Sequence, residues 1–288
     1  MKTITRAATM QRQSMTWRQE GLAIAIVPTM GYLHAGHESL IKRARQLVNP
    51  PGKVIVSIFV NPTQFGPHED FERYPRSDRA DLKRCRELGA DIVFKPTVAT
   101  IYPQEPPPAF SSFVSEESLS QTMEGQSRPI HFRGVATIVS ILFNIAQPTL
   151  AVFGEKDFQQ AAIVKKFVKD LHFPVKIVLG ATVREPDGLA LSSRNKYLNA
   201  EERPHATVLW RCIQHARHAL RSHAGPLAAA PLKNTLVKVV KQTPHAKLDY
   251  VEFFDPTSLQ PVSQLTRRHR IALSVRFGST RLIDNGKL

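Results

Sequence analysis

Short apolar runs alternate with amphipathic segments along the first two thirds of the chain. Aliphatic and β-branched residues dominate three runs, at Leu22–Val27, Lys53–Val60 and Asp91–Phe94, which predict buried strands. Two further runs, at Leu150–Phe153 and Val175–Leu179, predict strands of the same kind. Because helical segments separate these runs, the pattern predicts an α/β fold with a Rossmann-like, doubly wound parallel sheet.

Amphipathic segments between the strands carry apolar residues at helical spacing. Helices are expected to start at Gly36 and Ser77 and to cover Val135–Ala146 and Phe158–Leu171. Ser77 has a side chain suited to an N-cap, and Gly89 is placed to end the same helix. In a parallel sheet of this type, ligands bind in the loops beyond the carboxyl ends of the strands.

The pattern changes beyond Arg194. One long helix is expected over Ala200–Ala224 and a second ends near Gln242, followed by strands at Leu248–Phe254 and Ile271–Val275. The sequence therefore predicts a Rossmann-like domain over residues 1–182 and a smaller C-terminal α+β domain over residues 183–288.

The formal net charge of +15 is unusually high and would attract anions, including nucleic acids and phosphorylated substrates. The Lys and Arg residues are scattered, however, and their densest clusters lack interleaved aromatic residues that could stack on bases. We therefore expect a charged surface rather than nucleic-acid binding as the main function.

Several features favour the cytoplasm. No apolar stretch reaches the ~18 residues that a transmembrane helix requires. The two cysteines, Cys85 and Cys212, form neither a CxxC pair nor a zinc spacing, so they are expected to be neutral thiols in a reducing compartment. Residues 1–20 are rich in Arg, Ser and Thr, which leaves a transit peptide as the alternative to a first helix or strand.

The segment Pro28–His37 (PTMGYLHAGH) lies between a predicted strand and a predicted helix. A helix N-terminus presents N–H groups and the positive end of its dipole, which favours a phosphate ligand. His34 and His37 are three residues apart, so both imidazoles lie on one side of the first turn. They can hydrogen-bond phosphate oxygens as negative charge develops, although a metal pair or two structural histidines would share this spacing.

Two polar clusters follow the ends of other predicted strands. The amides of Asn61 and Gln64, in FVNPTQF, are suited to orient a polar, uncharged part of a substrate. In GEKDFQQ, Lys156 offers a positive charge for phosphate and Asp157 can cap the next helix, although an ordinary capping turn would look the same.

Two further clusters fall in predicted loops. The hydroxyls of Ser192 and Ser193 and the guanidinium of Arg194 are suited to phosphate oxygens. The segment Ser127–Gly134 (SRPIHFRG) is expected to be a cationic loop that precedes a helix. Because a doubly wound sheet gathers such loops at one edge, the clusters together predict a nucleotide-binding enzyme.

These motifs resemble, in order, those of the pantothenate synthetases. The resemblance rests on VPTMGYLHAGH, SIFVNPTQF, RYPR, SRPIHFRGV, VFGEKDFQQ, DGLALSSRNKYL and RLIDN, the last of which is Arg281–Asn285. It runs from about residue 20 to the end of the chain. Members of this family condense D-pantoate with β-alanine, using ATP and Mg²⁺, and belong to the nucleotidylyltransferase superfamily with its HxGH signature.

The resemblance implies a set of site residues. ATP contacts are expected at Met30, Gly31, Tyr32, Leu33, His34, Ala35, Gly36, His37, Gly154, Glu155, Lys156, Asp157, Val183, Leu191, Ser192, Ser193 and Arg194. The pantoate and β-alanine pocket is expected to include Asn61, Gln64, Arg128, His131 and Gln160. Catalytic roles are expected for His34, His37, Lys156 and Arg194, with His37 as the proton donor.

The resemblance also implies a homodimer and a C-terminal domain that closes over the active site. Ala80 and Arg84 replace carboxylate and amide groups that lie near magnesium in some relatives, which leaves Asp81 as the expected metal ligand. Mg²⁺ is therefore expected to depend mainly on the ATP phosphates. Two other departures from the family lie in the loops: Thr63 replaces a usual Met and alters an apolar wall, and Ile130 replaces a usual Gly and stiffens its loop.

The expected reaction proceeds through an adenylate. The pantoate carboxylate attacks the α-phosphorus of ATP and releases pyrophosphate, after which the amine of β-alanine displaces AMP. Two other interpretations fit part of the sequence. Another adenylyltransferase would share HxGH but would not be expected to carry FVNPTQF or HFRG, and a basic RNA-binding protein would not require the catalytic His, Lys and Arg residues.

Overall fold

The computed structural model describes residues 1–67 and 69–288, which divide into two compact units. Unit 1 comprises Met1–Ser120, Arg128–Glu155 and Gln160–Ala181. Unit 2 comprises Gln121–Ser127, Lys156–Gln159 and Thr182–Leu288. Two short segments that precede Thr182 in the sequence therefore belong to unit 2.

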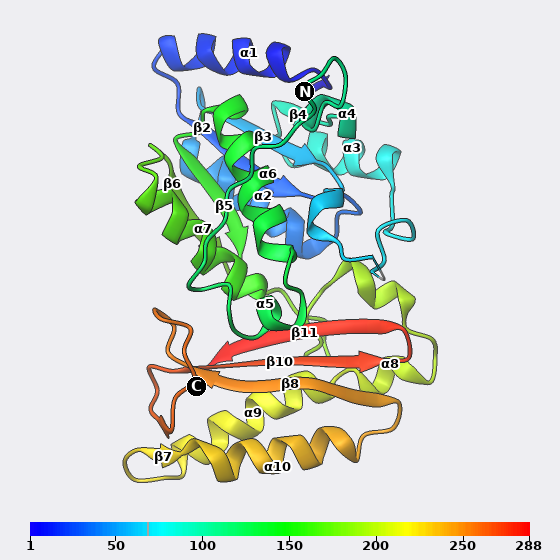
Figure 1. Cartoon of the computed structure of the whole chain (residues 1–288), viewed down its shortest axis with the longest axis vertical. Helices are drawn as coiled ribbons and strands as arrows, with labels where there is room; N and C mark the ends of the chain where they lie inside the picture. The colour runs from blue at the N-terminus through cyan, green and yellow to red at the C-terminus, as the bar shows by residue number, and fades with distance from the viewer. Residues whose placement is uncertain (68) are drawn as a thin grey trace. The chain divides into compact units, whose positions relative to one another are not determined.

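Unit 1 is built on a six-stranded parallel sheet in the order β1-β4-β3-β2-β5-β6 (Figure 1). The strands are β1 (Lys2–Ile4), β2 (Ile24–Thr29), β3 (Lys53–Ile58), β4 (Ile92–Phe94), β5 (Leu150–Gly154) and β6 (Lys176–Gly180). The central strands are buried on both faces, as parallel sheets with helical crossovers require. The expected α/β fold with a doubly wound parallel sheet is thereby confirmed.

Helices cover both faces of this sheet. One face packs on α2 (Ala35–Val48) and α3 (Asp78–Glu87), whose apolar residues meet alternate residues of β2, β3 and β4. On the other face, α1 (Ala7–Gln19) packs against α6 (His131–Ala146), and both contact β2. The remaining elements of unit 1 are η1 (Pro62–Gln64), α4 (Val98–Ile101) and most of α7 (Phe158–Asp170).

Local structure in unit 1 corrects one expectation. Helix α6 begins at His131, so the second half of the expected SRPIHFRG loop is a helical turn. A Cβ on Gly134 would lie 2.4 Å from the carbonyl oxygen of Thr63, so only glycine lets α6 come this close to η1. Ser77 is the N-cap of α3, as expected, but its side chain makes no capping hydrogen bond.

Unit 2 has a three-stranded antiparallel sheet in the order β11-β10-β8. Its strands are β8 (Ala246–Phe254), β10 (Arg270–Phe277) and β11 (Thr280–Lys287), with a short ladder of β7 (Leu227–Ala228) and β9 (Gln264–Leu265). Helix α9 (Val208–Arg221) contacts β10 and β11, and α10 (Ala229–Lys241) contacts β8 (Figure 1). These helices bury one apolar face of the sheet in a single core.

The C-terminal part differs from the sequence-based picture in two details. The long helix expected over Ala200–Ala224 is two helices, α8 (Glu202–His205) and α9. Strand β11 was not expected, because its sequence RLIDN places charged and amide side chains in buried positions. Unit 2 also contains α5 (Glu124–Ser127) and the 3₁₀ turn η3 (Ser193–Tyr197), while η2 (Glu155–Asp157) spans the change from unit 1 to unit 2.

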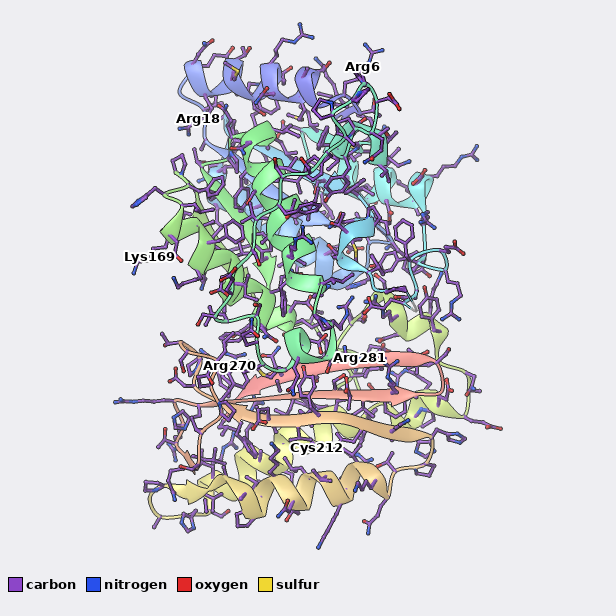
Figure 2. The ribbon with its side chains drawn as sticks, in the orientation of Figure 1. Arg6, Arg18, Lys169, Cys212, Arg270 and Arg281 are labelled. Atoms are coloured by element: carbon purple, nitrogen blue, oxygen red, sulfur yellow. The ribbon has the colours of Figure 1, made fainter. Side chains whose placement is uncertain are left out.

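The thiols and the helices fit the sequence-based picture. Burial raises the pKa of Cys85 to about 12 and that of Cys212 to about 11, so both thiols stay protonated near neutral pH. Cys212 lies on α9 (Figure 2). Within the described residues, every helix is too short or too polar to cross a bilayer.

Candidate functional site

The HAGH loop joins β2 to α2, and its two histidines are fixed by backbone hydrogen bonds. His34 is the N-cap of α2, and its Nδ1 accepts from the N–H of Gly36 at 3.2 Å. His37 makes the reciprocal hydrogen bond, in which its Nδ1 accepts from the N–H of His34 at 3.4 Å. The ring centres are 4.1 Å apart. An imidazole whose Nδ1 accepts carries its proton on Nε2, so this network assigns both rings the Nε2–H tautomer.

Asp81 of α3 holds the turn that precedes these histidines. Gly31 and Tyr32 both have positive φ, 81° and 51°, which directs successive N–H groups toward one side. The carboxylate of Asp81 accepts from the N–H of Tyr32 at 2.7 Å and from that of Leu33 at 2.8 Å. A Cβ on Gly31 would lie 3.1 Å from Asp81 Oδ2, in a conformation that already disfavours a side chain.

Burial raises the pKa of the Asp81 carboxyl, although the N–H groups of Leu33 and Tyr32 oppose that rise. Asp81 thus uses both oxygens to hold the HAGH turn. No group of three or more His, Cys, Asp or Glu side chains within the described range could hold a metal ion. Asp81 as a magnesium ligand therefore stays a prediction.

Asn61 and Gln64, after β3, belong to a buried amide cluster. Asn61 Nδ2 donates to Gln64 Oε1 and to the carbonyl of Gly134, both at 3.1 Å. Asn61 Oδ1 accepts from the hydroxyl of Tyr102 at 2.8 Å. Gln64 Nε2 lies 3.2 Å from the sulfur of Met30, which connects this cluster to the β2–α2 loop. Asn61 therefore organises the loop, while Gln64 extends from it toward the residues around Met30.

Arg128 and His131 lie against the same cluster. His131 Nδ1 is 2.9 Å from the carbonyl oxygen of Gln64, and Arg128 Nη2 donates to that oxygen at 3.2 Å. Arg128 also makes a two-point ion pair with Glu69, at 2.7 Å and 2.5 Å. Burial alone would raise the pKa of Glu69, but hydrogen bonding and the charge of Arg128 lower it overall. The structure thus brings Met30, Gln64, Arg128 and His131 into one connected group within unit 1.

The Lys156 segment belongs to unit 2. Lys156 Nζ lies 3.3 Å from Asp157 Oδ1, and its carbonyl oxygen accepts from Asn285 Nδ2 at 2.7 Å. The neighbouring Gly154 and Glu155 belong to unit 1, as does Gln160 in the first turn of α7.

The last cluster is the turn that carries Arg194 in unit 2. Ser192 is the N-cap of η3, and its Oγ accepts from the N–H of Arg194 at 3.3 Å. The N–H of Leu191 donates to the carbonyl of Val183 at 3.0 Å, which places two of the expected ATP contacts side by side. Ser193 is buried.

The expected site residues are thus distributed over both units. Those in unit 1 are Met30–His37, Asn61, Gln64, Asp81, Arg128, His131, Gly154, Glu155 and Gln160. Those in unit 2 are Lys156, Asp157, Val183 and Leu191–Arg194. Sequence reasoning missed Tyr102, Glu69 and Asn285, whose importance depends on tertiary contacts. The RLIDN motif was the one sign of Asn285.

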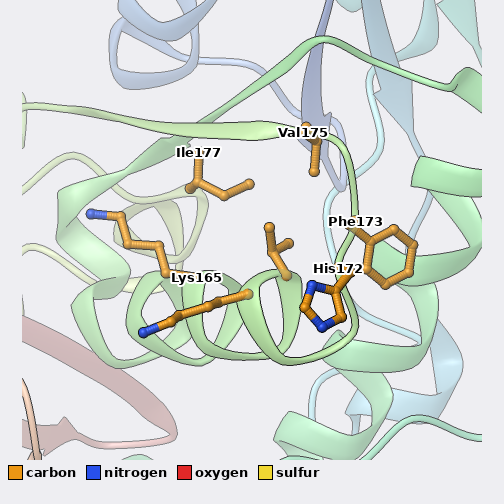
Figure 3. Close-up of a pocket in the computed structure, with 7 residues that line it drawn as sticks. Lys165, His172, Phe173, Val175 and Ile177 are labelled. Atoms are coloured by element: carbon orange, nitrogen blue, oxygen red, sulfur yellow. The ribbon is translucent and has the colours of Figure 1, made fainter.

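A cavity of about 460 Å³ lies elsewhere in unit 1, beside α7 and β6 (Figure 3). Val175 and Ile177 stand above the helix, with Lys165 at one end and His172 and Phe173 at the other. None of the expected site residues lines it. We therefore place the candidate site at the HAGH loop and its connected group, not at this cavity.

Comparison with known proteins decides the family. The family model for pantoate-beta-alanine ligase matches residues 2–287. The chain belongs to this family. It is 46% identical over 285 residues to the pantothenate synthetase of Desulfatibacillum aliphaticivorans, covering 99% of this chain and 98% of the relative. It is 49% identical over 272 residues to that of Moorella thermoacetica, covering 93% of this chain and 92% of the relative.

Solved structures of the pantoate–β-alanine ligase family share the fold. Pantothenate synthetase from Thermus thermophilus matches with a TM-score of 0.89 and 40% identity, covering 100% of this chain and 99% of that one. Pantoate-beta-alanine ligase from Francisella tularensis, described as complexed with beta-gamma ATP and beta-alanine, matches with a TM-score of 0.79 and 33% identity. That match covers 100% of this chain and 97% of the other. The resemblance stated from the motifs is confirmed over the whole chain.

Proposed function

We propose that this ligase joins D-pantoate to β-alanine in an ATP-dependent reaction that passes through pantoyl adenylate. The pantoate carboxylate oxygen attacks the α-phosphorus, a P–O bond forms, and pyrophosphate leaves with the electrons of the broken P–O bond. The neutral amine of β-alanine then attacks the acyl carbon, AMP leaves, and the nitrogen loses a proton. The observation that carries the proposal is the pair of Nε2–H imidazoles fixed at the start of α2.

Each group has a proposed role that follows from its chemistry. The Nε2–H groups of His34 and His37 donate hydrogen bonds to phosphate oxygens, and His37 is the proposed donor to the oxygens on which charge builds as the leaving group departs. Lys156 and Arg194 supply positive charge for the phosphates, with the Ser192 and Ser193 hydroxyls beside them. The remaining proposed ATP contacts are Met30–Gly36, Gly154–Asp157, Val183 and Leu191.

Gln64 and Gln160 are proposed to hold pantoate, with Arg128 and His131 at the border of its pocket. Gln64 is well placed for this role because its carbonyl oxygen is fixed by His131 and Arg128 and its side chain by Asn61. A fixed amide loses little conformational entropy when it binds a hydroxyl group.

Magnesium is proposed to enter with the phosphates of ATP, because the residues around Asp81 do not fit a protein-held site. Both oxygens of Asp81 are used by backbone N–H groups, and the neighbouring positions are Ala80 and Arg84. Mg²⁺ commonly binds through substrate phosphates and water rather than through a full protein cage. None of the proposed catalytic steps depends on a protein ligand to the metal.

The same proposal includes a homodimer in the cytoplasm. The homodimer is proposed from the resemblance of the motifs alone, and the two buried, protonated thiols support the proposed reducing compartment.

The assay of half-reactions tests the proposed function. With ATP and pantoate alone, we expect one equivalent of pyrophosphate per active site and little AMP, since the adenylate stays bound. Adding β-alanine should start continuous release of AMP and pantothenate. ATP with β-alanine alone is the control and should release neither. Absence of pyrophosphate with every substrate combination would overturn the proposal.

A further inference from the structure

The carboxyl end of β11 carries two buried polar side chains, Asp284 and Asn285. They are 3% and 6% exposed, and polar groups this deep destabilise a fold unless they are hydrogen-bonded. Asp284 accepts two hydrogen bonds from Arg184, at 2.6 Å and 2.9 Å, and the charge of this arginine balances that of the buried carboxylate. Asn285 carries no charge to balance, so its burial has a different cause.

Asn285 links an arginine of the sheet to the main chain of Lys156. Its Oδ1 accepts from Arg270 Nη2 at 2.6 Å, and its Nδ2 donates to the carbonyl oxygen of Lys156 at 2.7 Å. A guanidinium only donates and a carbonyl oxygen only accepts, so the two partners fix the orientation of the amide. A carboxylate in its place could still accept from Arg270 but could not donate to the carbonyl oxygen of Lys156.

The residues that follow Lys156 are held by the same unit. The guanidinium carbon of Arg270 lies 4.0 Å from the centre of the Phe158 ring, and the centre of that ring lies 5.8 Å from the centre of the Phe254 ring. Arg270 itself projects from β10 (Figure 2). Gln159 accepts from the N–H of Glu124 at 3.0 Å and donates to Thr122.

We infer that Asn285 is a positioning residue, which fixes the main chain of Lys156 and thereby the reach of its ammonium group toward ATP. The inference rests on the phosphate role proposed above for Lys156. A displaced cation stabilises transition-state charge less well, even where substrates still bind. Asn285 therefore acts on the rate of adenylation, and it acts through Lys156.

A double-mutant cycle tests this coupling. The measured quantity is the single-turnover rate of pyrophosphate release with saturating ATP and pantoate, in wild type, Asn285→Asp, Lys156→Ala and the double variant. We expect Asn285→Asp to lower the rate by about 10- to 100-fold, with the pantoate KM unchanged within about twofold. In the Lys156→Ala background, Asn285→Asp should change the rate by less than about twofold, because the group that it positions is gone.

Controls separate positioning from general damage to the sheet. Ser274→Ala removes a buried polar side chain of the neighbouring strand β10, which is hydrogen-bonded to Asp249, and should keep the wild-type rate. If Asn285→Asp lacks a cooperative thermal transition, Asn285→Ser replaces it, since a serine hydroxyl is too short to reach Lys156.

The outcomes are distinct. An equal loss of rate from Asn285→Asp in both backgrounds, or no loss in wild type, overturns the inference while leaving the role of Lys156 intact. Wild-type activity in Lys156→Ala overturns the role of Lys156 and, with it, the inference.

Discussion

At the start of α2, His34 and His37 each use Nδ1 to accept a backbone N–H, which places the ring proton on Nε2. The capping bonds therefore do more than stabilise the helix end, because they select the tautomer that can donate to an oxyanion. Sequence spacing predicted the position of both rings but could not predict this choice. It depends on the backbone conformation of the turn.

We predict that His37→Ala lowers the rate of adenylate formation by about 10²- to 10⁴-fold, the usual range for loss of a positioned donor to developing negative charge. Single-turnover release of pyrophosphate measures this rate. The matched control is His215→Ala, at an exposed position of α9, which should retain full activity. Unchanged turnover in His37→Ala would refute the role given to this residue.

We predict that Asp81→Asn raises the KM for ATP about tenfold and lowers the free energy of unfolding by about 1–3 kcal/mol. The new amide turns a donor toward the N–H of Tyr32 or Leu33, which leaves the HAGH turn without one of its two bonds. Steady-state kinetics and urea unfolding measure the two effects. Asp78→Asn, at an exposed position of the same helix, serves as the control. If excess Mg²⁺ restored the wild-type KM for ATP in Asp81→Asn, the result would instead favour Asp81 as a metal ligand.

At the scale of elements, the strands of the parallel sheet were predictable from the sequence, but the ends of some helices were not. β2, β3, β5 and β6 lie within one or two residues of the apolar runs. For the central strands β2, β3 and β5 the reason is burial on both faces, which requires a nearly continuous apolar run. The start of α6 was missed because His131 and Arg133 resemble a polar loop, and their place in a helix depends on packing against η1.

Strand β11 was missed for a related reason. Its buried Asp284 and Asn285 are stable only beside Arg184 and Arg270, which are distant in sequence. A local sequence pattern carries no information about partners that are distant in sequence. RLIDN was therefore recognised as a motif, but its strand structure was not predicted. The same limit applies to Tyr102, whose hydroxyl bonds to Asn61.

The ion pair between Glu69 and Arg128 connects the segment after η1 to the start of α6, and it gives a prediction for pH. The pKa of Glu69 is lowered from 4.5, so its ionised form stabilises the fold above that value and loses this effect as the pH falls through the lower, folded pKa. We expect Glu69→Gln to lower the free energy of unfolding by about 1 kcal/mol at pH 7.

The difference between Glu69→Gln and wild type should stay constant from pH 7 to about 5.5 and then shrink as the pH falls further to about 3.5, as measured by urea unfolding at intervals between pH 7 and 3.5. The control is Glu20→Gln, which changes an exposed carboxylate in the same unit. A difference that stays constant over this range would show that the ion pair does not carry the effect.

At the scale of the whole molecule, positive charge is spread rather than concentrated. Arg6 and Arg18 lie at opposite ends of α1 and Lys169 lies on α7 (Figure 2). Such a distribution attracts anionic substrates. That nucleic-acid binding is not the main function stays a prediction. Membership of the pantoate–β-alanine ligase family, over residues 2–287, agrees with an enzyme of anionic small molecules.

The central claim is that a pantoate oxygen attacks the α-phosphorus of ATP. Transfer of label from pantoate with both carboxylate oxygens replaced by ¹⁸O tests this claim most directly, with ATP and β-alanine present and the products separated for mass spectrometry. We predict one ¹⁸O atom in each AMP, one in each pantothenate amide carbonyl and none in pyrophosphate. AMP without the label, or label in pyrophosphate or phosphate, would contradict it.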